Sequence, residues 1–162
     1  MVFENYISEQ FILSPNHFTS TTAYFTGWQE LADFVSVNST LWASYTTGRD
    51  LPWDYWNAPN RYTPLYDMIH FGGAVRYEIA ARNVQMASVG IQFEPFHHRF
   101  IGLDVYGGRF MNNWNFDLSE DDIDLGITLT LGAQTILGPI KVLFSQSTFS
   151  RFKSEIQIGY QF

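Results

Sequence analysis

The last eleven residues of the chain, 152–162, place apolar and polar side chains at alternating positions. One parity carries Phe152, Ile156, Ile158, Tyr160 and Phe162, and the other carries Lys153, Glu155, Gln157, Gly159 and Gln161. Successive residues of a β-strand point to opposite faces of a sheet, so this segment has one apolar and one polar side. The pattern predicts a strand at this end of the chain.

The segment 122–136 shows the same alternation over a longer stretch. Its apolar positions are Ile123, Leu125, Ile127, Leu129 and Leu131, and its other positions are Asp122, Asp124, Gly126, Thr128, Thr130 and Gly132. The second set holds two carboxylates and no apolar side chain, which is hard to reconcile with a buried face of a soluble sheet. The pattern indicates a strand with lipid on one side and a polar lumen on the other.

Composition agrees with a membrane barrel and argues against other classes of protein. The 162 residues form a single expected domain, 1–162. Aromatic residues make up 18% of the chain, yet the mean hydropathy is only −0.11, as an apolar lipid face combined with a polar interior would give. No apolar run reaches the ~18 residues of a membrane-spanning helix. The net charge of −7 argues against nucleic acid, and without cysteine there is no thiolate metal site.

Comparable strand patterns recur along the chain. They fall at about 2–13, 17–27, 33–47, 68–80, 84–94, 99–110 and 138–149, with a turn near Gln29–Asp33, a Gly-Pro turn at Leu137–Pro139 and an aromatic loop over 48–66. The fold class expected is therefore all-β, an antiparallel up-and-down transmembrane β-barrel with about 8–10 strands in this chain. Single-chain bacterial barrels close with an even number of strands, so the apparent count of nine leaves the closure open.

The order of these features resembles the C-terminal β-barrel region of the bacterial surface antigen superfamily. That superfamily contains outer-membrane assembly factors, two-partner secretion transporters and the barrel domain of bacterial patatin-like phospholipases. The resemblance runs from about His70 to Phe162 and rests on Phe71–Tyr77, Val89–Phe93, Phe100–Gly108, Leu137–Val142 and Ile158–Phe162. It implies the outer membrane of a Gram-negative bacterium, with the lipid bilayer and the outer-membrane assembly machinery as partners. Ile156, Ile158, Tyr160 and Phe162 would form the C-terminal assembly signal.

Two departures limit what the resemblance implies. Val75-Arg76-Tyr77 lacks the glycine of the family's Val-Arg-Gly-aromatic motif and reads as part of a strand, so that motif's function is not carried over. The family barrel has sixteen strands, about twice the number expected here, which leaves two alternatives: a compact eight-stranded closure, or self-association as a homodimer. The chain has neither a Gly-x-Ser-x-Gly elbow nor a patatin-type Asp-Gly segment. We therefore expect a membrane anchor or a pore or translocation scaffold, and no enzyme in this chain.

Two groups of side chains are candidate functional residues. The polar residues expected in the barrel lumen are Arg76, Glu78, Asp104, Asp122, Asp124, Lys153 and Glu155, either as a channel lining or as an interior salt-bridge network. The aromatic residues expected at the membrane interface are Trp53, Tyr55, Trp56, Tyr62 and Trp114. These aromatic residues could alternatively form a platform for an oligosaccharide or lipopolysaccharide.

Residues with catalytic or metal-binding chemistry are sparse. His97 and His98 are more consistent with a solvated turn than with a metal site, and neither a metal nor another cofactor is expected. His17 and His70 could serve as bases with a serine partner, which leaves a small outer-membrane enzyme or lipid-binding barrel as an alternative. A soluble ligand-binding β-barrel is a second alternative, and it would require apolar residues inside.

Overall fold

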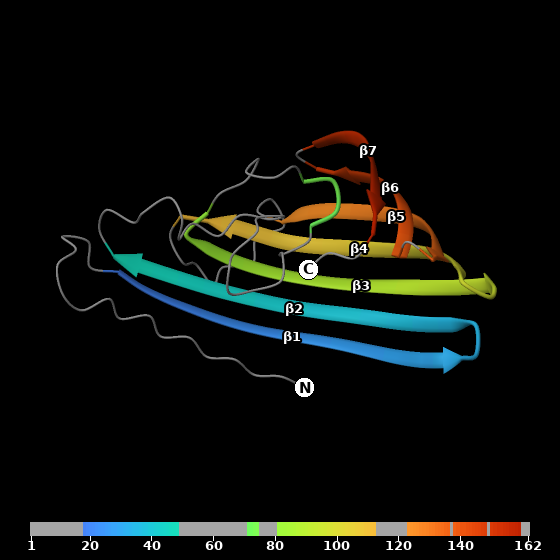
Figure 1. Cartoon of the computed structure of the whole chain (residues 1–162). Helices are drawn as coiled ribbons and strands as arrows, with labels where there is room; N and C mark the ends of the chain where they lie inside the picture. Colours follow the sequence, from blue (N-terminus) through green and yellow to red (C-terminus); the bar gives the residue numbers. More distant parts are fainter. Residues whose placement is uncertain are drawn as a thin grey trace.

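In the computed structural model, seven strands form one antiparallel sheet (Figure 1). The structure describes residues 18–48, 71–74, 81–112, 123–136, 138–148 and 150–159. The strands are β1 (Phe18–Ala32), β2 (Val35–Gly48), β3 (Asn83–Phe96), β4 (Arg99–Met111), β5 (Asp124–Thr135), β6 (Gly138–Ser147) and β7 (Ser150–Ile158). Each strand pairs with the next one in the sequence, which confirms the all-β, antiparallel up-and-down fold.

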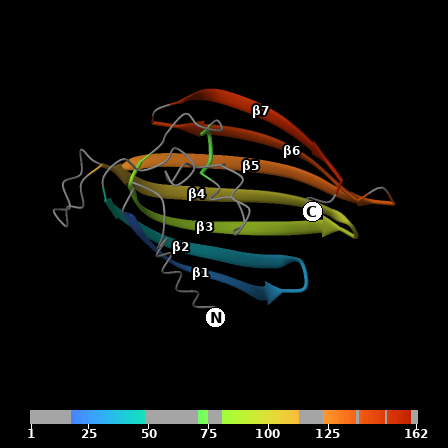
Figure 2. The same cartoon turned by 60° about the vertical axis from the view of Figure 1, so that its left-hand side comes forward.

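The sheet is a continuous curved layer that runs from β1 to β7 (Figure 2). Within the described ranges it is not closed, since β1 and β7 form its two ends. The expected strand at 2–13 and most of the one at 68–80 lie outside the described residues. The structure therefore shows a seven-stranded antiparallel wall.

Most expected strand boundaries agree with the structure to within a few residues, and one is wrong. The strand expected at 17–27 continues to Ala32, and the turn expected near Gln29–Asp33 is a two-residue turn at Asp33–Phe34. Pairing of Gln29 with Val37 and of Glu30 with Ser36 extends the ladder through polar residues whose local composition suggested a turn. Pairing in the β-ladder therefore outweighed the local preference of these residues for a turn.

Gly138 and Pro139 are the first two residues of β6, so the strand begins at Gly138 as expected at 138–149, and the expected Gly-Pro turn overlaps its start. A proline has no amide hydrogen to give to the ladder and is tolerated at the beginning of a strand. The Pro139 carbonyl still accepts a hydrogen bond from the Gly159 amide at 2.9 Å. Gly138 has a φ of 101°, a left-handed conformation that glycine adopts without steric cost. The Gly-Pro pair thus begins the strand.

The short turns of the sheet are staggered. Val35, directly after the β1–β2 turn, pairs with Phe93, which lies three residues before the end of β3 at Phe96. Arg99 pairs with Ala133, two residues before the end of β5 at Thr135. Successive turns are two strand spacings apart, ~9.6 Å, and are offset by three and two residues, ~9.9 and ~6.6 Å along the strands. The strands therefore tilt by about 40° from the normal to the line of turns.

Candidate functional site

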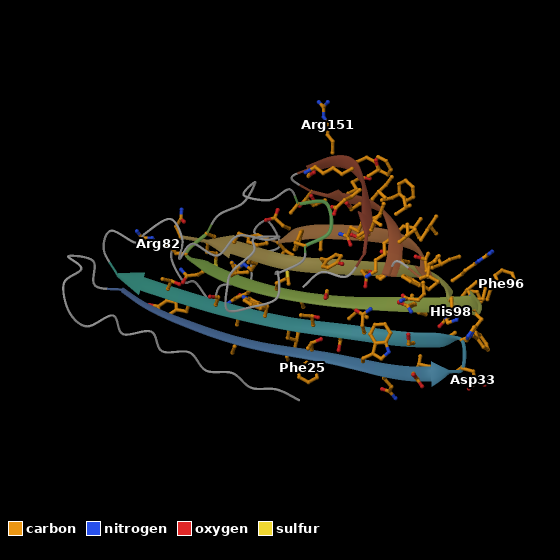
Figure 3. The ribbon with its side chains drawn as sticks, in the orientation of Figure 1. Phe25, Asp33, Arg82, Phe96, His98 and Arg151 are labelled. Carbon is orange, nitrogen blue, oxygen red and sulfur yellow. The ribbon has the colours of Figure 1, made fainter. Side chains whose placement is uncertain are left out.

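The apolar positions of the central strands share one face of the sheet, which we call the outer face. Register places Ile91 beside Leu103 and Leu103 beside Leu129. The large apolar side chains of this face are 38–59% exposed: Leu41, Val89, Ile91, Phe93, Ile101, Leu103, Val105, Leu125, Ile127, Leu129 and Leu131. Phe25 of β1 also projects away from the sheet (Figure 3). The outer face is therefore an apolar surface over most of β2 to β5, and it is bounded toward the start of β3 and the end of β4 by Gln85 and the buried Arg109.

The opposite face, which we call the inner face, carries most of the buried side chains of the sheet, and many of them are polar or small. Ser44 and Thr128 are 1% exposed, and Ser36 and Ser88 are 9% exposed. Gly90, Gly102, Gly108 and Gly126 lie at other buried positions of the same parity. Val84, Met86, Tyr106 and Leu143 are buried on this face as well. The buried face is therefore mixed and the exposed face is apolar, whereas a soluble sheet exposes its polar parity.

One hydrogen bond on the inner face joins strands that are not neighbours. Asn38 of β2 and Asp104 of β4 both pair with Gly90 of β3, from its two sides. The Asn38 Nδ2 group donates to Asp104 Oδ1 at 3.2 Å across this glycine. A Cβ atom at Gly90 would overlap the Asp104 carboxylate and lie 2.6 Å from Asn38 Nδ2. Glycine at position 90 therefore allows a bond that spans three strands.

A short turn of main chain, Phe71–Ala74, packs on the inner face of β4 to β6. The Ala74 amide donates to the Phe71 carbonyl at 3.1 Å, and Gly73 has a φ of 85°. The Phe71 side chain is fully buried, with its ring centroid 5.7 Å from that of Tyr106 and 5.4 Å from that of Phe110. The strand expected at 68–80 is therefore wrong over these four residues, because two consecutive glycines and packing against the wall favour a turn.

Glycines on both sides allow the turn to approach the wall closely. A Cβ atom at Gly126 of β5 would lie 2.5 Å from the Gly72 carbonyl oxygen, and one at Gly73 would lie 2.7 Å from the carbonyl carbon of Gln146 in β6. Neither position can gain a side chain unless main chain moves. The main chain of the Phe71–Ala74 turn thus packs directly against the main chain of β5 and β6.

The described members of the predicted lumen set all have the inner parity. Asp104 and Lys153 belong to one row of paired residues that runs through Thr128 and Ser145. Glu155 pairs with the buried inner residue Leu143, and Asp124 pairs with Gly108. The Thr148 hydroxyl donates to Asp124 at 3.0 Å, and the Gln157 amide group donates to Glu155 at 2.8 Å. These carboxylates lie on different rows of one face and form no compact cluster.

Other predicted site residues are only partly described. Ile156 and Ile158 of β7 carry the outer parity and are 68% and 70% exposed. Eight further residues lie outside the described part of the chain: Arg76, Glu78 and Asp122 of the lumen set, and all five interfacial aromatics, Trp53, Tyr55, Trp56, Tyr62 and Trp114. Tyr160 and Phe162 of the terminal signal lie outside it as well. Their proposed roles stay predictions.

His97 and His98 form the exposed turn between β3 and β4, as predicted. The His98 amide donates to Glu94 Oε1 at 3.1 Å, and the two imidazole centroids lie 3.8 Å apart. Among the described residues, no group of three or more His, Asp or Glu side chains could hold a metal ion. The other candidate bases, His17 and His70, lie outside the described ranges.

In the portion of the chain that the structure describes, no helix is long and apolar enough to cross a membrane.

Sequence reasoning missed two features of the inner face. One is the cross-strand bond of Asn38, and the other is the inward position of Phe71–Ala74. The signal for the turn was present in the Gly72-Gly73 pair directly after an aromatic residue, a composition more typical of a turn than of a strand. Nothing local marks Asn38, whose partner lies 66 residues away.

Comparison with known proteins adds no family to this geometry. A scan against protein-family models and a search of curated proteins each found no match.

The contact between the turn and the wall can be tested with Gly126→Val. The new side chain would displace the Gly72 carbonyl and the Phe71 ring, so we expect destabilisation of ~1–3 kcal/mol, typical of overpacking. Gly102→Val on the neighbouring strand is the matched control, because a Cβ atom there meets nothing closer than 3.5 Å. Thermal unfolding in detergent, followed by circular dichroism, measures both; equal losses would show that the turn does not rest on Gly126.

The Asn38–Asp104 hydrogen bond can be tested with a double-mutant cycle of Asn38→Leu and Asp104→Leu. Hydrogen bonds to a charged group contribute ~1.5–3 kcal/mol, so the two substitutions should be less than additive by about that amount. Urea unfolding of the four proteins gives the coupling energy. A coupling energy of zero would mean that the bond adds nothing to stability.

Proposed function

We propose that this chain forms part of the wall of a transmembrane β-barrel in the bacterial outer membrane. We further propose that it acts as a membrane anchor or a pore scaffold. The observation that carries the proposal is the exposed, apolar outer face of β2 to β5, opposite an inner face whose buried positions are mostly polar residues and glycine, with an apolar cluster around Phe71. In hydrocarbon the apolar face needs no further cover. In water it would form an exposed patch far beyond the few hundred Å² usual for a monomer.

Strand length and tilt fit the thickness of a bilayer. Strands β2 to β6 contain 10–14 residues. At a tilt of about 40° each residue advances ~2.5 Å along the barrel axis, so these strands cross ~25–35 Å, against a hydrocarbon thickness of ~30 Å. The tilt itself falls within the ~35–45° of membrane barrels.

The connections differ between the two ends of the sheet. Asp33, Phe96 and His98 lie at the end with the short turns, and Arg82 lies at the opposite end (Figure 3). Of the three connections at that opposite end, two are long, 49–82 and 112–123, and the third, between β6 and β7, has two residues. Membrane barrels have short periplasmic turns and longer extracellular loops, so the proposed orientation places Asp33 and His98 in the periplasm.

The inner face supports a scaffold more than an open channel. Phe71–Ala74 covers the inner side of β4 to β6, and the Asn38–Asp104 bond adds a polar layer beside it. A soluble ligand-binding barrel needs a polar exterior, and the exposed apolar outer face of β2 to β5 does not fit that requirement. No contact among the described residues favours an enzyme over a scaffold.

The first test is the behaviour of the purified chain without detergent. The proposal expects aggregation in buffer, and in detergent a folded band whose migration on a denaturing gel changes after boiling. A chain that stays dispersed without detergent and migrates identically cold and boiled would overturn the membrane location.

The lipid-facing assignment can be tested with Leu129→Arg at the middle of β5. A cation on the lipid side near the bilayer centre costs ~2–4 kcal/mol, so folding into vesicles should fall steeply. The control is Thr130→Arg, which places the same cation on the inner face one residue away. Folded fractions come from the heat-modifiable band; equal effects of the two arginines would contradict the assignment of faces.

A further inference from the structure

We infer that three turns of the sheet lie in the headgroup layer of a phospholipid leaflet, and that Arg99 binds lipid phosphate there. These are the β1–β2, β3–β4 and β5–β6 turns, which share one end of the sheet and which we call the basal turns. The inference rests on the proposed function and names the lipid groups that this end of the wall contacts. In the proposed orientation the leaflet is the one that faces the periplasm.

Each basal turn holds or adjoins a large apolar side chain that is exposed. Phe34 is 53% exposed, Phe96 is 67% exposed and Ile136 is 102% exposed. Turns in water are built mainly from glycine, proline and small polar residues. Large apolar side chains at all three basal turns therefore indicate surroundings that are partly apolar.

Two of these side chains are held on the outer face. Phe96 pairs with Arg99, and directly paired residues of an antiparallel ladder share a face. The Phe34 ring meets the ring of the outer residue Phe93 edge to face, with 5.6 Å between the centroids. The Glu94 amide donates to the Phe34 carbonyl at 2.8 Å, which ties the first basal turn to β3. The aromatic side chains thus continue the apolar outer face up to the turns.

Polar side chains at the basal turns exclude a position deep in hydrocarbon. Asp33, His97 and His98 are exposed, and Figure 3 shows Asp33 and His98 at the same end of the sheet as Phe96. Charged side chains are costly near the centre of a bilayer. The boundary between headgroups and acyl chains accommodates both apolar and polar side chains. The mixed composition of the basal turns therefore fits the headgroup layer.

Arg99 adds a cation at the edge of the apolar outer face. It is exposed, and it has the same parity as Ile101, the next outer residue of β4. A long cationic side chain near the end of a membrane segment lays its aliphatic part along apolar neighbours and extends its charged group to the headgroups. The anion at that level is lipid phosphate, which a guanidinium matches with two parallel hydrogen bonds. Charge and position together favour lipid phosphate as the partner of Arg99.

The spacing of charged residues on β4 agrees with the height of a membrane band. Arg99 and Arg109 share the outer parity and are ten residues apart. The outer positions between them carry no polar side chain: Ile101, Leu103, Val105 and Gly107. At ~2.5 Å per residue the two arginines are ~25 Å apart along the barrel axis, which is the height of the apolar band in membrane barrels. With Arg109 at one boundary of the band, Arg99 falls at the headgroups of the other.

The depth of the basal turns can be measured with single cysteines, because the chain contains none. One environment-sensitive fluorophore is attached to each of four variants folded into phosphatidylcholine–phosphatidylglycerol vesicles: Phe96→Cys, Ile136→Cys, His97→Cys and Leu103→Cys. The quenchers are iodide in water and lipids brominated either near the carbonyl group or near the end of the acyl chain. We expect the labels at Phe96 and Ile136 to respond most to the shallow bromine. The label at Leu103 should respond most to the deep bromine, and the label at His97, the matched control beside Phe96, to iodide.

Two results would overturn the position of the basal turns. Labels at Phe96 and Ile136 that respond to iodide as strongly as the His97 label would show that the turns project into water. Labels there that respond to no quencher would indicate a protein partner in place of lipid. In both cases the membrane barrel stands if the Leu103 label responds to the deep bromine. A Leu103 label that iodide quenches overturns the proposed function as well.

Arg99→Glu tests the contact with phosphate. A carboxylate at headgroup level is repelled by lipid phosphate, so the folded fraction in vesicles should fall several-fold, and the loss should grow with the share of anionic phosphatidylglycerol. Arg99→Lys keeps the cation and should fold like the unchanged chain. Lys141→Glu is the matched control, because it makes the same reversal at an inner position, paired with Gly132 and Gln157. Its effect should not depend on lipid charge. A loss in Arg99→Glu that is equal with and without phosphatidylglycerol would show that Arg99 does not contact lipid phosphate.

Discussion

The antiparallel ladder from β1 to β7 is the constraint on which the rest of this structure depends. Its period of two assigns every residue to a face, so a single register fixes both the apolar outer surface and the buried inner surface. A slip of one residue between β4 and β5 would bring Leu129 inside and Thr128 outside. The register of the ladder is therefore determined by the difference between its two faces as well as by its hydrogen bonds.

The inner face depends in turn on positions that carry no side chain. Gly90 leaves room for the bond between Asn38 and Asp104, and Gly126 leaves room for the main chain at Gly72. In both places a glycine on one strand determines whether a segment distant in the sequence can pack against the sheet. The interior is consequently built from long-range contacts that pass over glycine.

The sequence predicted the strands well where apolar and polar residues alternate strictly. It predicted them less well where tertiary contacts determine the local structure. In β5 the alternation of Leu129 and Thr130 was sufficient, because the apolar and polar sets do not mix. In β1 the ladder extended through Gln29 and Glu30 against their local preference, and Phe71–Ala74 formed a turn because the wall offers it a place. Asn38 carried no local signal, since a polar residue in a strand gives no information about a partner 66 positions away.

The distribution of side-chain volume between the two faces also sets how closely another segment can approach each of them. Gly90, Gly102, Gly108, Gly126 and Gly132 share the inner parity with larger residues such as Tyr106 and Phe110, while branched aliphatic side chains fill the outer parity in the middle of β3 to β5. Beside a glycine, main chain can meet main chain, as Gly72 meets Gly126. A neighbour on the outer face meets side chains instead, so the two faces of one sheet admit different kinds of contact.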